Sequence, residues 1–357
     1  MLMAIQECRF ALPKAQQIVM SAHSQTAFKI MPVQISFSSA TPSQISPLEE
    51  LKAKQTTSKT WLAENNISAA RLQELSKAAS KACHAAHQEI LKTKLTIQSK
   101  NNNPKDLVTN ADFASESVLR KILMQADPNA DFIGEESFDT TQKRIPNFEN
   151  KNCWIVDPID GTSNFIKGGT YHIAIAYTIK GKVVLGNILE IPGYKYHQPV
   201  LYSAILGEGA YRGEGVNKEQ LLVSRLTHSI DKSRIGYAIT KNTKGGLAKQ
   251  ISDQLRLAGA QIVNQVGGIY AALRVAAGGQ HGSEYDAAFD TGSWTWDSAA
   301  TSLIVTEAGG KVTNLSGNAL NTGARREPVI YSTGADMHQA MLSNLPSNHK
   351  DILKLHG

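Results

Sequence analysis

The stretch Trp154-Ile-Val-Asp-Pro-Ile-Asp-Gly-Thr-Ser-Asn-Phe165 joins an apolar run to a polar turn. The run Cys153–Val156 predicts a buried strand that ends at Asp157. The proline and the glycine that follow break regular structure, so Asp160 can face the same point as Asp157. Two carboxylates this close repel each other unless a cation lies between them, and oxygen ligands of this kind suit Mg²⁺.

The turn itself has two explanations. Gly161 lets the backbone approach a ligand closely, and a helix that begins near Thr162 would offer free N–H groups to a phosphate. A tight strand-to-helix turn, in which the aspartates only cap backbone N–H groups, would also account for the stretch. The stretch alone leaves both explanations open.

Three further segments place acids where a strand ends or a helix begins. Gly134-Glu135-Glu136-Ser137 follows a short apolar run, Asp106–Asp112 reads as a helix start, and Trp294–Ala300 puts Asp297 where a helix should begin. Each signal is weak alone, since acids at strand ends often face solvent and acids in a first helical turn favour the helix dipole. Their occurrence together is much more specific.

Together these segments resemble the inositol monophosphatase family, the lithium-sensitive, Mg²⁺-dependent phosphatases. That family shows Gly-Glu-Glu, Asp-Pro-Ile-Asp-Gly-Thr and Trp-Asp-x-Ala motifs in this order, and all three are intact here. The resemblance covers roughly residues 70 to 345. It implies a layered α-β-α-β-α sandwich of the inositol monophosphatase and fructose-1,6-bisphosphatase type, and an enzyme that hydrolyses phosphomonoesters with two or three Mg²⁺ ions.

The resemblance also implies a set of metal ligands. Glu135 is the first acid of the Gly-Glu-Glu motif, Asp157 would bridge two metals, and Asp160 and Asp297 would hold the second metal. The carbonyl oxygen of Ile159 would complete the shell of the first metal.

Further roles follow from the same resemblance. Thr162, supported by Asp112, would orient or activate the attacking water, and the backbone N–H groups of Gly161 and Thr162 would hold the phosphate. Asp290, seven residues before Asp297, would contact substrate hydroxyls. His172 is left without a role, and a core or surface histidine is expected there, as at position 281.

The expected substrate is a small polyol phosphate, with inositol monophosphate first. Ser163-Asn164-Phe165 is closer to the inositol monophosphatase form than to the Lys-Gly-Phe of 3′(2′),5′-bisphosphate nucleotidases. That nucleotidase activity, or a sugar-bisphosphate or histidinol-phosphate phosphatase, stays an alternative because the fold does not choose among them. A catalytically silent relative is disfavoured because none of the expected ligands is lost.

Periodicity predicts an α/β (α+β) architecture with mixed sheets. One helix is expected from residue 68 to the sequence at 101–104, and a second from its N-cap at Asn110 to 127–129. A hairpin is expected at 171–179 and 183–189, and a turn-rich connection around the glycines from 207 to 215. Further strands are expected at 234–239, 261–265 and 328–332, and further helices at 246–257, 268–277 and 297–308.

The chain is expected to divide at residue 67. Residues 1–67 form an N-terminal extension whose first 46 residues are basic, acid-poor and hydroxyl-rich, typical of a transit peptide or of a disordered segment. Residues 68–350 form the catalytic domain, with sub-domains of about 68–225 and 226–350. The cytoplasm is the expected location and an organelle the alternative. No apolar run is long enough for a membrane span.

The charge and the cysteine content of the chain narrow the classes of molecule that it is expected to bind. The 357 residues carry a formal charge of +6, but the basic residues form no block, so a basic surface around an anionic small-molecule site is favoured over nucleic-acid binding. The three cysteines, Cys8, Cys83 and Cys153, are too few and scattered for a disulfide framework or a zinc site. A small phosphate ester is the expected ligand, with neither nucleic acid nor membrane as a partner, and the resemblance implies a homodimer.

Overall fold

A computed structural model of the chain describes ten ranges or positions. These are residues 46–99, 107–139, 145, 148–193, 198–224, 229–238, 246–265, 267–278, 285–347 and 349, without the side chains of residues 47, 264 and 265. All statements below concern these residues.

The larger sheet has seven strands in the order β3-β4-β5-β6-β7-β8-β9. The pair β3 and β4 is parallel, and each later pair is antiparallel. The strands are β3 (Asp131–Gly134), β4 (Cys153–Asp160), β5 (Tyr171–Ile179), β6 (Lys182–Ile191), β7 (Val200–Ile205), β8 (Gly209–Arg212) and β9 (Glu219–Gln220).

The second large sheet has five strands in the order β11-β10-β12-β14-β13. Its β10 pairs in parallel with both β11 and β12, whereas β14 is antiparallel to β12 and β13. The strands are β10 (Arg234–Ala238), β11 (Gln261–Gln265), β12 (Ala287–Trp294), β13 (Lys311–Thr313) and β14 (Arg326–Ser332); a separate antiparallel pair joins β1 (Ile97–Ser99) to β2 (Leu107–Thr109).

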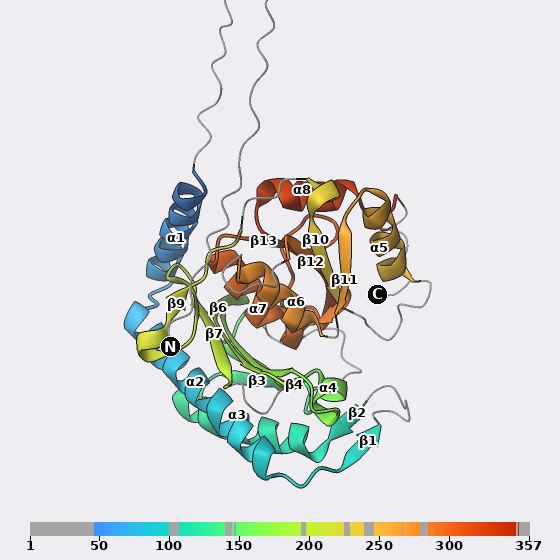
Figure 1. Cartoon of the computed structure of the whole chain (residues 1–357). Coiled ribbons are helices and arrows are strands. Elements are labelled where there is room, and N and C mark those ends of the chain that lie inside the picture. Colours follow the sequence, from blue (N-terminus) through green and yellow to red (C-terminus); the bar gives the residue numbers. More distant parts are fainter. Residues whose placement is uncertain are drawn as a thin grey trace, which may run out of the picture. The chain divides into compact units, whose positions relative to one another are not determined.

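Helices separate and cover the sheets, which gives the α-β-α-β-α order expected from the sequence (Figure 1). Helices α2 and α3 pack on the seven-stranded sheet, α6 and α7 lie between the two sheets, and α5 and α8 pack on the five-stranded sheet. The helices are α1 (Pro47–Glu64), α2 (Ala69–Lys92), α3 (Asn110–Ala126), α4 (Thr162–Ile166), α5 (Leu247–Leu257), α6 (Gly268–Ala276), α7 (Thr295–Glu307) and α8 (Ala335–Ser343), with 3₁₀ turns η2 (Gly215–Asn217) and η3 (Ile230–Lys232).

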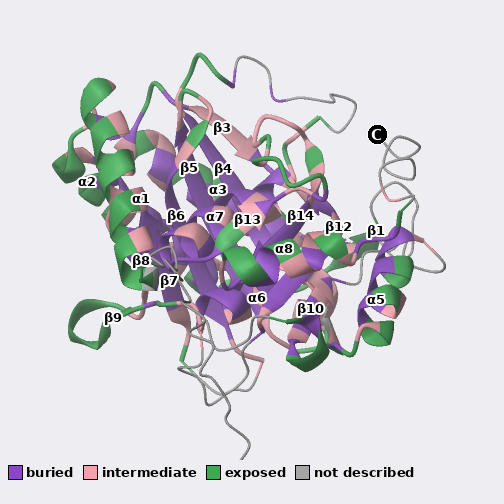
Figure 2. Cartoon of the chain, turned by 90° about the horizontal axis from the view of Figure 1, so that it is seen from above, coloured by how far each residue is buried: buried purple, intermediate pink, exposed green. Residues whose placement is uncertain are grey.

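Side-chain alternation along β12 shows why the five-stranded sheet is covered on both faces. Ala287 and Phe289 belong to a cluster with α5 and α8, whereas Ala288 belongs to the large core that contains α6 and α7. Successive residues of a strand point to opposite faces, so both faces of β12 are buried. Figure 2 shows the same pattern, with buried residues along the strands and α7 and exposed residues on α1, α2 and α5.

Most of the expected elements are present. The helix from Asn110 ends at Ala126, although its N-cap is Thr109. The hairpin of β5 and β6 and the helices α5, α6 and α7 lie where the periodicity predicts them. Strand β12 was not expected, although the apolar run at Ala287–Phe289 is a signal for it.

Two predicted boundaries are wrong. Helix α2 ends at Lys92 because Asn110 diverts the following chain: its side chain accepts from Thr96 N at 2.7 Å and donates to Lys94 O at 2.7 Å. The expected turn-rich connection at 207–215 contains strand β8, which follows directly on β7. Their tight turn forms because the Glu307 carboxylate accepts from the N–H groups of Gly207 and Gly209, at 2.9 and 2.8 Å.

Helix α1 lies within the segment that the sequence analysis assigned to the N-terminal extension. Ser46 caps it together with Glu49, and Leu51 and Leu62 are buried. Residues 47–64 are therefore part of the packed structure, whereas residues 1–45 lie outside the described part of the chain. No helix among the described residues is long and apolar enough to cross a membrane.

Candidate active site

A bulge in β4 brings the two aspartates of the central stretch to one face of the sheet. Asp157 pairs with Ala174 and Asp160 with His172, so β4 advances three residues while β5 advances two. Without the extra residue, side chains three positions apart would point to opposite faces. The bulge is held because Ile159 N donates to Asp157 Oδ1 at 3.0 Å and Ser115 Oγ donates to Pro158 O at 3.0 Å.

Parallel pairing of β3 with β4 places Glu135 beside Asp157. Gly134 pairs with Val156, and Glu135 N donates to Val156 O at 3.2 Å. The Glu116 carboxylate fixes this turn, since it accepts from Glu136 N at 2.8 Å. A Cβ atom at position 134 would lie 2.3 Å from the same carboxylate, so a side chain there would displace it.

Helix α7 contributes the third aspartate. Asp297 lies in its first turn and accepts from Trp294 N at 3.2 Å, as expected for a helix-terminal acid. One carboxylate oxygen each of Asp157, Asp160 and Asp297 lies within 4.8 Å of the others, and this group could hold a metal ion. The sequence analysis named all three residues, and the fold brings them together.

The charge of this cluster is poorly compensated by the protein. Burial, and then the neighbouring charges of Glu135, Asp160 and Asp297, raise the pKa of Asp157 well above its ordinary value. Burial and the charges of Asp160, Glu135 and Asp290 raise the pKa of Asp297 in the same way. Closely placed carboxylates resist ionisation together, and a divalent cation among their oxygens would remove this cost. The donor set therefore fits a hard metal ion.

Thr162 and Asp112 form a hydrogen-bonded pair at the start of α4. Thr162 Oγ1 lies 3.2 Å from both Asp112 Oδ1 and Ile159 O, so its one hydrogen is shared between two acceptors. Asp112 is buried, and its other oxygen accepts from Thr109 N at 2.8 Å and Thr109 Oγ1 at 2.6 Å. Gly161 precedes the pair with φ of 86°, the left-handed conformation that the turn requires.

Asp290 is buried in β12. Its Oδ1 accepts from Gly292 N at 2.8 Å, and its Oδ2 would lie 3.1 Å from a Cβ atom at Gly268. Burial raises the pKa of Asp290 to about 6, against the opposing effects of the Gly292 hydrogen bond and the Arg326 charge. The carboxylate thus lies at the beginning of α6, in the neighbourhood of Asp160.

His172 is a site residue that the sequence analysis left without a role. It is buried, so of the two expected alternatives it is a core histidine rather than a surface one. Its Nδ1 also lies 3.2 Å from Asp160 Oδ2. No motif marks it, because its place beside Asp160 depends on the pairing of β4 with β5. Positions 106 and 281 lie outside the described residues.

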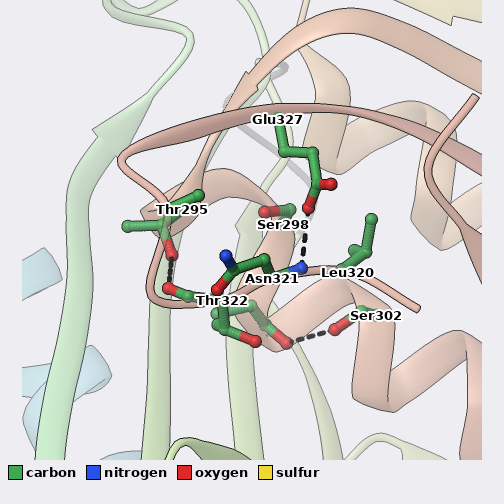
Figure 3. Close-up of a pocket in the computed structure, with 9 residues that line it drawn as sticks. Thr295, Ser298, Ser302, Leu320, Asn321, Thr322 and Glu327 are labelled. Carbon is green, nitrogen blue, oxygen red and sulfur yellow. Dashed lines mark hydrogen bonds between the residues drawn. The ribbon is translucent and has the colours of Figure 1, made fainter. Parts of the chain in front are cut away.

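A small cavity beside α7 is not part of this cluster. About 10 Å³ is open to the centre of a water molecule there, near the minimum for a single water and far too little for a phosphate ester. Its polar groups largely pair with each other: Thr295 Oγ1 donates to Thr322 O at 2.8 Å and Asn321 N to a Glu327 carboxylate oxygen at 2.7 Å (Figure 3).

Comparison with known proteins gives the family. The pattern of the inositol monophosphatase family matches residues 69–350. The chain belongs to the inositol monophosphatase family. Inositol monophosphatase 2 of Solanum lycopersicum is 34% identical over 251 residues, which cover 67% of this chain and 85% of that protein. Inositol monophosphatase 1 of Bos taurus is 31% identical over 266 residues, 72% of this chain and 88% of that protein.

Solved structures of inositol monophosphatases share the fold. The protein from Anabaena (Nostoc) sp. PCC 7120 has a TM-score of 0.61 at 23% identity and covers 77% of this chain and 96% of its own. Inositol monophosphatase II of Staphylococcus aureus MSSA476 has a TM-score of 0.60 at 25% identity, with 78% and 95% covered. As an inositol monophosphatase family member, the protein is a phosphatase.

The role of Glu116 in shaping the turn that carries Glu135 generates a prediction. Glu116→Ala leaves the Glu136 N–H without this acceptor, so we expect the free energy of unfolding to fall by about 1–2 kcal/mol and phosphatase activity to fall with it. Glu116→Gln keeps an acceptor oxygen of the same reach and should lose clearly less of both. Urea unfolding and phosphate release measure the two effects; equal losses in Ala and Gln variants would count against the hydrogen bond.

Proposed function

We propose that the protein is a Mg²⁺-dependent phosphomonoester hydrolase of small polyol phosphates, with an inositol monophosphate as its substrate. The observation that carries the proposal is the gathering of Asp157, Asp160 and Asp297 within 4.8 Å, beside the Thr162–Asp112 pair. Phosphoryl transfer depends mainly on positioning and on neutralising charge, and both can be supplied by such a site.

The metal-binding role is assigned to the residues that the family resemblance implies. Glu135, Asp157, Asp160 and Asp297 would supply carboxylate oxygens, and Ile159 a carbonyl oxygen, to two or three Mg²⁺ ions. Bound Mg²⁺ would act as a Lewis acid that stabilises the charge developing on the phosphoryl group and lowers the pKa of water. The bulge in β4 keeps Asp157 and Asp160 oriented together before a metal binds, so little reorganisation is required.

Thr162 is assigned the positioning of the attacking water. Its hydroxyl can accept a hydrogen bond from a water while donating its own hydrogen to Asp112 Oδ1. Asp112 is suited to this because Thr109 holds its second oxygen and fixes the carboxylate. A proton leaving the water can therefore be taken up at Thr162 Oγ1 as that atom passes its own to Asp112 Oδ1.

The substrate assignment has support from solved relatives. Structures of SaIMPase-II, 25% and 24% identical to this chain, hold inositol monophosphate in one case and 2′-AMP in another. The first favours our substrate, and the second keeps a nucleotide phosphatase as the alternative, beside sugar-bisphosphate and histidinol-phosphate phosphatases. Backbone N–H groups of Gly161 and Thr162 would hold the phosphate, and Asp290 would contact hydroxyls.

Phosphate release tests the proposal directly. We expect inositol 1-phosphate to be hydrolysed only when Mg²⁺ is added, and faster than adenosine 3′,5′-bisphosphate or fructose 1,6-bisphosphate. Asp157→Asn removes one negative charge from the cluster at nearly constant volume, so activity should fall by at least about 100-fold.

The outcomes separate mechanism from substrate. Preference for another ester, with Mg²⁺ dependence intact, would keep the metal site and reject the inositol assignment. Folded protein that hydrolyses none of these esters at any Mg²⁺ concentration would indicate a catalytically silent relative. The exposed Val216→Ala serves as control and should behave as the unmodified protein.

The Thr162 hydroxyl allows a second test. Thr162→Ala removes the group that holds the water, so kcat should fall by about 100-fold or more, whereas Thr162→Ser keeps a hydroxyl and should lose less than about 10-fold. Steady-state kinetics at saturating Mg²⁺ measures both. If the Ala and Ser variants lose the same activity, the hydroxyl does not act on the water.

The proposed oligomeric state rests on the family resemblance, and the proposed location is the one expected from the sequence. A homodimer of the 38.7 kDa chain in the cytoplasm is proposed, with an organelle as the alternative location. Sedimentation should give twice the chain mass, and microscopy of a tagged full chain decides the compartment. A monomer at micromolar concentration would reject the dimer.

A further inference from the structure

Three directly opposed residues on β4, β5 and β6 of the seven-stranded sheet form a row that begins at Asp160. Asp160 on β4 pairs with His172 on β5, and His172 pairs with Glu190 on β6. Directly opposed residues project from the same face, so the three side chains meet. His172 Nδ1 lies 3.2 Å from Asp160 Oδ2, and its Nε2 lies 3.4 Å from Glu190 Oε2.

Arg274 closes the row from the other side of the core. It lies on α6, and its guanidinium donates to Glu190 Oε2 and, at 3.2 Å, to Tyr202 Oη. The side chains of Glu190 and Arg274 are only 10% and 11% exposed. A buried carboxylate is costly unless it is paired, and here Arg274 supplies the opposite charge. Despite burial, His172 and Arg274 lower the pKa of Glu190 to about 2, so it stays ionised.

Tyr270 and Gly267 complete the enclosure. The Arg274 guanidinium lies 4.6 Å from the centre of the Tyr270 ring, and that ring lies 6.2 Å from the His172 imidazole. A Cβ atom at Gly267 would lie 3.0 Å from Asp160 Oδ2, the oxygen that His172 contacts. Asp160 is thus held between an imidazole and the backbone before α6, which leaves little freedom for its carboxylate to rotate.

We propose that His172, held in place by Glu190 and Arg274, is a positioning residue that fixes the Asp160 carboxylate for metal binding. By holding Oδ2, the imidazole would fix the orientation of this carboxylate beside Asp157 and Asp297. Groups that orient a ligating side chain in this way commonly contribute 10–100-fold to metal affinity. This inference rests on the metal role proposed above for Asp160.

The test uses Mn²⁺ as a spectroscopic probe of the site in the full chain. Electron paramagnetic resonance of free Mn²⁺ gives the number of bound ions and their Kd without any substrate, and the Mg²⁺ concentration for half-maximal phosphate release gives an independent readout. His172→Phe keeps a ring but removes both polar contacts. The Kd of this variant for the Mn²⁺ ion that Asp160 would help to bind should therefore rise by about 10-fold or more.

Two isosteric variants distinguish the contacts of His172. The amide nitrogen of asparagine can occupy the place of Nδ1, and that of glutamine the place of Nε2. His172→Asn should therefore restore most of the Mn²⁺ affinity, because it keeps a donor toward Asp160. His172→Gln should restore less, because its donor faces Glu190. A stronger rescue by glutamine would contradict the assignment.

His338→Phe is the matched control. This histidine is equally buried but pairs with Thr313 Oγ1 and Ser332 Oγ, so its loss should lower thermal stability and leave the Mn²⁺ Kd unchanged.

The inference is overturned if folded His172→Phe binds Mn²⁺ with a Kd within twofold of that of the unmodified protein. If His172→Phe does not fold, Glu190→Gln takes its place, with a rise of at least threefold expected and no rise overturning the proposal. Absence of Mn²⁺ binding by the unmodified protein would instead remove the metal site itself, and the inference with it.

Discussion

Repulsion among carboxylates is the constraint around which the structure is arranged. The bulge in β4 turns Asp157 and Asp160 to one face, and the beginning of α7 adds Asp297 within 4.8 Å. Burial and the neighbouring carboxylates raise the pKa of Asp157 and that of Asp297. The surrounding fold must therefore be stable enough to hold them together, and a bound cation would offset their repulsion.

Close packing of α7 against both sheets provides that stability. On one side the helix approaches β6 so closely that a Cβ atom at Gly186 would lie 2.9 Å from Ala300 O. At its far end Glu307 accepts from the turn between β7 and β8. Because the same helix also contacts β14, the position of Asp297 is fixed relative to β4 by both sheets. The packing of the core therefore also sets the position of Asp297.

Sequence motifs identified the clustered acids, but not the residues that surround them. Motifs around Asp157 and Asp297 are local, and a strand end or helix start presents an acid in a foreseeable way, so those residues could be named. His172 and Glu190 carry no motif, because their meeting depends on the register of three strands. Strand registers are set by long-range packing, which a single sequence does not display.

The same reason explains the fold-level errors. Helices α3, α5, α6 and α7 and the β5–β6 hairpin are local patterns, and they were predicted well. The end of α2 was missed because it is set by Asn110, far along the chain. Strand β12 was missed because both of its faces are buried, which removes the alternation of apolar and polar residues that marks a half-exposed strand.

The acids of the cluster come from distant parts of the sequence, and this separation links cation binding to the stability of the folded protein. Asp160 comes from the first sheet and Asp297 from the helix between the sheets, so the proposed cation site would form only in the completed fold. An unfolded chain has no such site, and a ligand that binds only the native state stabilises it by mass action. The supply of divalent cations in the surrounding fluid would then set the lifetime of the folded protein as well as its rate of turnover.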